Sequence, residues 1–184
     1  MVPPGKVTGI VGGGEQKARE QAQFIRTVDS GREHWIYARI AEKKKDSATA
    51  EREYRQYINL SKGDAEAWLN LALFFRHQKR FDEMEQAIIK LSQAPNPEPD
   101  VLWEASAMLE RAGRSYPFAT ELVNRYLALG PVEKAPAFRA HYLRGALLEK
   151  QGDKAGAARE YRASLSLAHN YGTAQQALRR VAHE

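Results

Sequence analysis

The chain has 184 residues, of which 43% are hydrophobic and 28% charged, and it contains no cysteine. This composition is typical of a globular protein and excludes collagen-like, mucin-like and fully disordered chains, membrane-spanning helices, disulfides and zinc-thiolate sites. The formal net charge of +5 is uneven, because residues 1–64 and 131–184 are basic and residues 65–130 slightly acidic, which permits an acidic partner without requiring one.

The first residues combine Pro3, Pro4 and three consecutive glycines at 12–14, a composition that predicts a flexible leader over residues 1–14. Residues 15–29 then place Ala18, Ala22 and Ile25 on one face of a helix. We expect this helix to pack in front of the first of several repeats.

An internal repeat follows. Pairs of small or slim residues recur 12 positions apart, and a bulky residue comes four positions after each second member. The pairs are Ala38/Ala50, Ala72/Met84, Ala107/Ala119 and Gly145/Ala157, followed by Tyr54, Ile88, Val123 and Tyr161. Small side chains let two antiparallel helices approach closely and bulky neighbours fill the remaining space, so each pair predicts one hairpin of two helices.

The spacing predicts the boundaries of these repeats within a single domain over residues 15–184. The repeats lie near 31–64, 65–98, 100–133 and 138–171, and residues 172–183 form a capping helix. Aspartate is a favoured residue at helix starts, so Asp64 and Asp100 are expected to begin first helices, and Asp82 and Asp153 second helices.

The second repeat carries the clearest motif. Trp68-x2-Leu71-Ala72-x2-Phe75 is followed by Met84-x3-Ile88 and Pro95, and this order resembles the tetratricopeptide repeat (TPR) pattern. The resemblance implies an all-α, right-handed α-α superhelix, a TPR-like solenoid of about four helix pairs plus an N-terminal helix and a C-terminal capping helix. It also implies a concave groove, lined by the first helix of each pair, that accepts a peptide or another protein.

Mapping the groove positions of such families onto this chain gives the candidate partner-binding residues. They are Trp35, Arg39, Leu69, Leu73, Arg76, His77, Met108, Arg111 and Tyr142. Apolar anchors beside cations would suit an apolar segment flanked by acidic groups. The alternative is that the N-terminal helix or a second copy of the chain covers some of them.

Motifs for catalysis or cofactor binding are not found in the sequence. The glycines near residues 9–14 lack both the Gly-Lys-Ser/Thr ending and the G-x-G-x-x-G spacing of phosphate loops. The five histidines do not form a metal-ligand pattern, and no serine motif has catalytic spacing. We therefore expect no enzyme activity, no cofactor and no metal.

The predicted function is that of a protein-binding adaptor or scaffold. One alternative is an oligomerising part of a larger secretion or biogenesis assembly. Nucleic-acid binding through the basic ends is a second alternative, disfavoured because base-reading positions and a dense basic stripe are missing. A clamp for chaperone tails is not expected, since only Asn70 matches its pattern. The compartment would be cytoplasmic for a full-length chain and periplasmic or extracytoplasmic for an excised domain.

Overall fold

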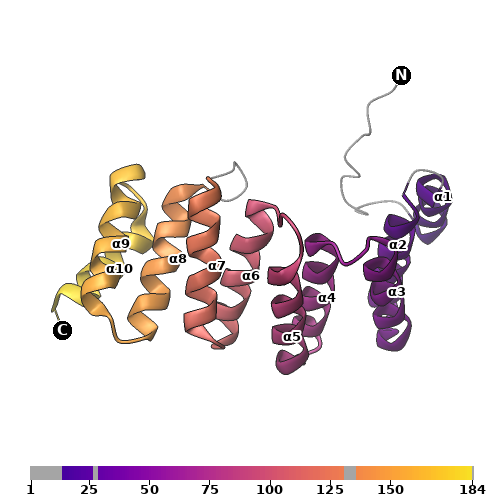
Figure 1. Cartoon of the computed structure of the whole chain (residues 1–184), viewed down its shortest axis with the longest axis horizontal. Coiled ribbons are helices and arrows are strands. Elements are labelled where there is room, and N and C mark those ends of the chain that lie inside the picture. The colour runs from indigo at the N-terminus through magenta and orange to yellow at the C-terminus, as the bar shows by residue number, and fades with distance from the viewer. Residues whose placement is uncertain (1–13, 27–28, 131–135, 184) are drawn as a thin grey trace, which may run out of the picture. The chain divides into compact units, whose positions relative to one another are not determined.

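The computed structural model of the protein describes residues 14–26, 29–130 and 136–183 (Figure 1). Within these ranges the chain forms ten α-helices and no β-strand. The helices are α1 (Glu15–Arg26), α2 (Ser30–Lys43), α3 (Ser47–Leu60), α4 (Ala65–His77), α5 (Phe81–Gln93), α6 (Pro99–Ala112), α7 (Tyr116–Leu129), α8 (Ala137–Lys150), α9 (Lys154–Leu167) and α10 (Gly172–His183). The predicted all-α fold class, with four helix pairs between a leading and a final helix, is confirmed.

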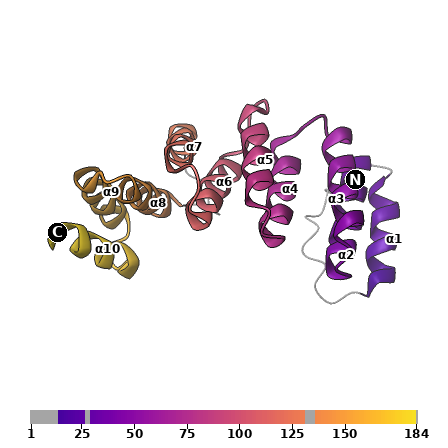
Figure 2. The same ribbon diagram turned by 90° about the horizontal axis from the view of Figure 1, so that it is seen from below.

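The residues divide into two compact units, one ending at Gly63 and the other beginning at Asp64. In unit 1, α1 packs against α2, and α2 pairs with α3. In unit 2, the pairs are α4 with α5, α6 with α7, and α8 with α9, and α10 packs against α9 (Figures 1 and 2). The single domain over 15–184 stays a prediction, since each unit is described by itself. Nearly all of the predicted leader, residues 1–13, lies outside the described residues.

The helix pairs meet where the repeat spacing predicts. Seven of the eight small or slim residues of the crossings are at most 3% exposed, and the eighth, Gly145, is buried as well. The closest approach is at Gly145, where an added Cβ would lie 2.6 Å from Cε1 of Tyr161. Because real Cβ atoms do not come this close to another atom, the fourth pair depends on glycine at this position.

Helix ends follow from local chemistry. Asp64 and Asp153 accept backbone N–H groups at the starts of α4 and α9, as predicted. The prediction that Asp82 and Asp100 begin their helices is wrong. Each lies inside the first turn of its helix, after the cap residues Arg80 and Glu98. An acidic side chain there still interacts favourably with the positive end of the helix dipole.

The turn within each repeat has a left-handed residue. Lys45, Lys79, Gly113 and Gly152 all have positive φ angles after the first helices. In each case the next residue donates its N–H back to a carbonyl five residues earlier, as Arg80 does to Phe75. This Schellman arrangement reverses the chain within three residues and sets the second helix against the first.

Candidate functional site

In unit 1, the predicted anchor Trp35 is half-buried. It packs against an apolar cluster that α1 and α2 build from Ala18, Ala22, Ile36 and Ile40. The cluster joins the leading helix to the first repeat, so Trp35 contributes to this packing.

Arg39, the predicted cation of unit 1, is held by its own repeat. Its Nη1 donates to Oε2 of Glu42 over 2.8 Å, and the hydroxyl of Tyr54 donates to the same oxygen over 2.6 Å. Burial and this hydrogen bond raise the pKa of Tyr54, which therefore stays a neutral donor. The carboxylate of Glu42 thus joins the two helices of the hairpin and holds Arg39 beside them.

The fourth repeat, in unit 2, has the same arrangement. Tyr161 donates to Oε2 of Glu149 over 2.6 Å. Arg180 of α10 binds both carboxylate oxygens of Glu149, over 2.6 and 2.9 Å, and lowers the pKa of that carboxyl. The final helix is thereby fastened to α8 by a bidentate ion pair as well as by apolar packing.

The second and third repeats differ at the equivalent positions. Arg76 and Arg111 stand where the other repeats have Glu42 and Glu149, and Ile88 and Val123 stand where they have tyrosine. At these two positions neither repeat has a carboxylate or a phenol, so the arginines are not drawn into their own hairpins. Arg111 makes one long contact, 3.4 Å, with Glu104 of its own helix, and Arg76 forms no ion pair with any described residue.

The predicted apolar anchors of unit 2 fall into two groups. Leu69 and Leu73 of α4 are half-buried, and His77 at the end of that helix is exposed. Tyr142 of α8 is half-buried and packs at the edge of a cluster with Tyr161, Ala177 and Val181. Leu69, Leu73 and Tyr142 therefore each leave part of the side chain accessible.

Met108 does not lie on this surface. Its side chain is 0% exposed, although its position in the repeat is the same as that of Leu73. Helix α6 contacts both α4 and α8, and the flexible Met side chain fills the space inside. The prediction that Met108 contacts a partner is corrected on this ground.

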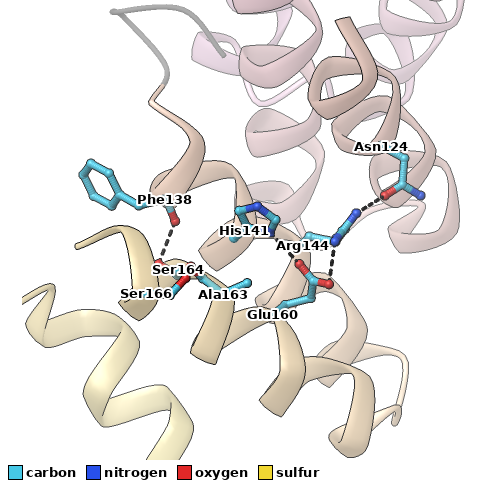
Figure 3. A network of polar contacts seen from close by, with 8 residues as sticks. All are labelled: Asn124, Phe138, His141, Arg144, Glu160, Ala163, Ser164 and Ser166. Atoms are coloured by element: carbon cyan, nitrogen blue, oxygen red, sulfur yellow. Dashed lines mark hydrogen bonds and ion pairs between the residues drawn. The ribbon is translucent and has the colours of Figure 1, made fainter. Parts of the chain in front are cut away.

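A polar network lies between α7, α8 and α9 (Figure 3). Glu160 accepts a hydrogen bond from Nη2 of Arg144 over 2.5 Å and lies 2.9 Å from Nδ1 of His141. Nη1 of Arg144 also donates to the side chain of Asn124 on α7 over 3.2 Å. These contacts connect the third and fourth repeats of unit 2 through charged and amide groups.

Solved structures with the same arrangement of helices were found. MamA matches with a TM-score of 0.68 and 15% identity, over 84% of this chain and 82% of that one. YrrB, described as a TPR protein with an unusual peptide-binding site, matches with a TM-score of 0.67 and 14% identity, over 89% and 82%. A structure of pilF from Pseudomonas aeruginosa has a TM-score of 0.61 and 16% identity, over 93% and 70%.

The chain has the TPR fold. No family model matches the sequence, and no curated protein matches it. The TPR assignment therefore rests on the helix architecture and on the repeat motif of residues 65–96.

Sequence reasoning missed the histidine pairs of the TPR array. Nδ1 of His34 lies 2.7 Å from Oε2 of Glu53 in the first repeat, and the His141–Glu160 pair of the fourth repeat is its equivalent, at 2.9 Å. The equivalent pairs of the second and third repeats are Trp68/Ala87 and Trp103/Leu122. Aligning the four repeats position by position would have shown that histidine goes with glutamate and tryptophan with an apolar residue.

Two features are missing from the part of the chain that the structure describes. No group of three or more His, Asp and Glu side chains is arranged to hold a metal ion. No helix of the described ranges is both long and apolar enough to cross a membrane.

Proposed function

We propose that the chain is a non-catalytic interaction module, an adaptor or scaffold, that binds a peptide or protein partner through unit 2. The binding surface would be the first-helix face, defined by Leu69, Leu73, Arg76 and His77 of α4, Arg111 of α6 and Tyr142 of α8. The similarity to YrrB, which is described as having a peptide-binding site, supports this proposal at the level of the fold.

One observation carries the proposal. On α4, the half-buried Leu69 and Leu73 lie on the same helix face as Arg76, which has no ion pair with a described residue. Partly exposed apolar groups gain free energy when a partner covers them, and an arginine beside them can bind a carboxylate bidentately. The partner expected is an apolar segment with acidic neighbours.

Unit 1 has a different role in this proposal. Trp35 packs against the α1–α2 cluster, and Arg39, although exposed, already binds Glu42, whereas Arg76 of α4 has no ion pair with a described residue. We therefore assign the main contacts to unit 2, which narrows the set of residues to test.

The test is a random-peptide display selection with the full chain as bait, followed by calorimetric titration of the selected peptides. We expect Leu73→Arg and Arg76→Glu each to weaken binding by at least about tenfold, which corresponds to about 1.4 kcal/mol. Lys90→Glu, an exposed charge reversal on α5, is the matched control and should bind as the wild type does.

Circular dichroism would check that the variants keep their helical content. Peptides that bind all four proteins with equal affinity would contradict the assignment to this face. A selection that yields acidic but not apolar positions would support Arg76 and contradict the leucines.

A further inference from the structure

The last three helices have an unusual charge balance. Residues 136–183 contain eight Lys and Arg but only three Asp and Glu. The excess of five positive charges equals the formal charge of the whole chain, so α8 to α10 account for it. Such an asymmetry suggests a polyanionic partner if the cations lie on the surface and the carboxylates do not neutralise them.

All three carboxylates of this segment have internal partners. Glu149 is bound by Tyr161 and Arg180, and Glu160 by His141 and Arg144, as described above. Asp153 accepts the backbone N–H of Gly156 at the start of α9. Glu149 and Glu160 therefore hold helices together and Asp153 caps its own helix, and six of the eight cations remain outside those ion pairs.

Four of those cations are exposed and form no ion pair with any described residue. They are Lys150, Arg159, Arg162 and Arg179. A fifth exposed cation, Lys154, is the first residue of α9, the helix that carries Arg159 and Arg162. Arg159 and Arg162 are three residues apart, which places them on one face of α9. Figures 1 and 2 both show α10 beside α9, and the apolar face of α10, with Ala174, Ala177 and Val181, is turned inward.

The residues between these cations decide which polyanion fits. The exposed positions of α9 and α10 also include Ala155, Ser166, Thr173 and Gln176, which are small or polar. Protein interfaces are usually anchored by aromatic or large aliphatic side chains in pockets. The large apolar side chain exposed here, Leu167, is the last residue of α9, at the edge of the charged face.

We propose that the α8–α10 basic surface, defined by Lys150, Lys154, Arg159, Arg162 and Arg179, binds the sugar–phosphate backbone of a nucleic acid without reading its sequence. Phosphate contacts require cations and no apolar anchors, and arginine binds phosphate through a planar fork of donors. Of the carboxylates that would repel phosphate, Glu149 and Glu160 are already paired with Arg180 and Arg144, and the exposed Asp153 caps α9. This surface differs from the first-helix face in its arginines, which come from α9 and α10, although α8 supplies Lys150 to this surface and Tyr142 to the first-helix face.

The experiment measures fluorescence anisotropy of a single-stranded oligothymidylate of about 20 nucleotides, titrated with the full chain. Four phosphate contacts on a single strand give a slope of about −2.8 in log affinity against log salt, or about a 50-fold loss between 50 and 200 mM. The triple variant Arg159→Gln, Arg162→Gln, Arg179→Gln should reduce the magnitude of that slope by about 2.

The matched control is Arg76→Gln, Lys79→Gln, Lys90→Gln, which removes the same number of charges from α4, α5 and their turn. We expect it to keep the oligonucleotide affinity and slope of the wild type. The α9–α10 variant should conversely keep its affinity for peptides selected on the first-helix face, so the two proposals can fail independently.

Three results would overturn the inference. One is the absence of oligonucleotide binding by the folded wild type at 50 mM salt. Another is an unchanged slope in the α9–α10 variant, with its helicity intact by circular dichroism. The third is selective binding to vesicles of phosphatidylserine and phosphatidylcholine instead of the oligonucleotide, which would assign the basic surface to lipid headgroups.

Discussion

The first and fourth helix pairs join their helices with a buried tyrosine that donates to a glutamate, whereas the second and third use aliphatic side chains at the same place. Tyr54 and Tyr161 reach Glu42 and Glu149 over 2.6 Å in both cases. In the other two repeats Ile88 and Val123 are fully buried and the facing position is an arginine. One position in the repeat therefore either stabilises the hairpin or stays available to a partner, depending on whether a phenol lies opposite it.

The substitution with the largest expected effect on stability lies at the fourth helix crossing. We expect Gly145→Leu to lower the free energy of unfolding by about 3 kcal/mol, because its side chain must displace Tyr161, which already lies 2.6 Å from an ideal Cβ. Chemical denaturation followed by circular dichroism measures the loss. Ala155→Leu on the exposed side of α9 is the control, and a Gly145→Leu midpoint equal to that of the control would contradict the crossing.

The hydrogen bond between the tyrosine and the glutamate can be tested by introducing both residues into the second repeat. Ile88→Tyr puts a hydroxyl into the second crossing without an acceptor, and we expect a loss of about 2 kcal/mol. Adding Arg76→Glu supplies the acceptor and should restore at least about 1 kcal/mol of that loss. A double-mutant cycle by urea unfolding measures the coupling, and independent, additive effects would show that the two positions do not interact.

The helix pairs were predictable from the sequence because tight helix crossings require small residues, which recur at a regular spacing. Ala72 and Met84, for example, are both buried where the spacing places them. The candidate site was less predictable, because exposure depends on neighbours outside the repeat. Leu73 and Met108 share a repeat position, yet Leu73 is half-buried and Met108 is 0% exposed, within a helix that contacts both α4 and α8.

The ion-pair partners of the charged side chains could not be predicted from the repeat pattern either. Arg39 and Arg76 read alike as cations of first helices, but a glutamate three residues along binds Arg39. The same holds for the basic C-terminal segment. Its density of cations and the cap role of Asp153 were visible in the sequence, but the pairing of Glu149 and Glu160 with residues of other helices was not. Side-chain partners across helices become evident only when the three-dimensional packing is known.

The polar network of the fourth repeat predicts a dependence of stability on pH. Burial alone would raise the pKa of Glu160, but hydrogen bonds from Arg144 and His141 outweigh burial and hold that pKa below its ordinary value. A carboxyl with a lowered pKa in the folded chain stabilises it fully above the unfolded pKa, and this stabilisation is lost as the pH falls through the folded pKa.

We therefore expect the free energy of unfolding to fall on acidification below the ordinary glutamate pKa of 4.5. Glu160→Gln should cost about 1 kcal/mol at neutral pH and make the acid-induced fall shallower. Thermal melts across this pH range give the comparison, with the exposed Glu121→Gln as control. An acid-induced fall of the same steepness in wild type and Glu160→Gln would contradict the role of the network.

The smallest expected change in stability concerns the turns within the repeats, which have a left-handed lysine in the first two repeats and a left-handed glycine in the last two. Lys45 and Lys79 have positive φ angles of 61° and 58°, where Gly113 and Gly152 serve in the other repeats. A side chain with a Cβ is strained in this left-handed region, and glycine is not. Lys79→Gly should therefore stabilise the chain by about 0.5 to 1 kcal/mol, even though glycine loses more conformational entropy on folding. Lys90→Gly, within α5, is the opposite control and should destabilise by about 1 kcal/mol. If both substitutions lower the melting temperature, the left-handed turn is not a source of strain, and the lysine contributes through its charge near the carboxyl end of α4.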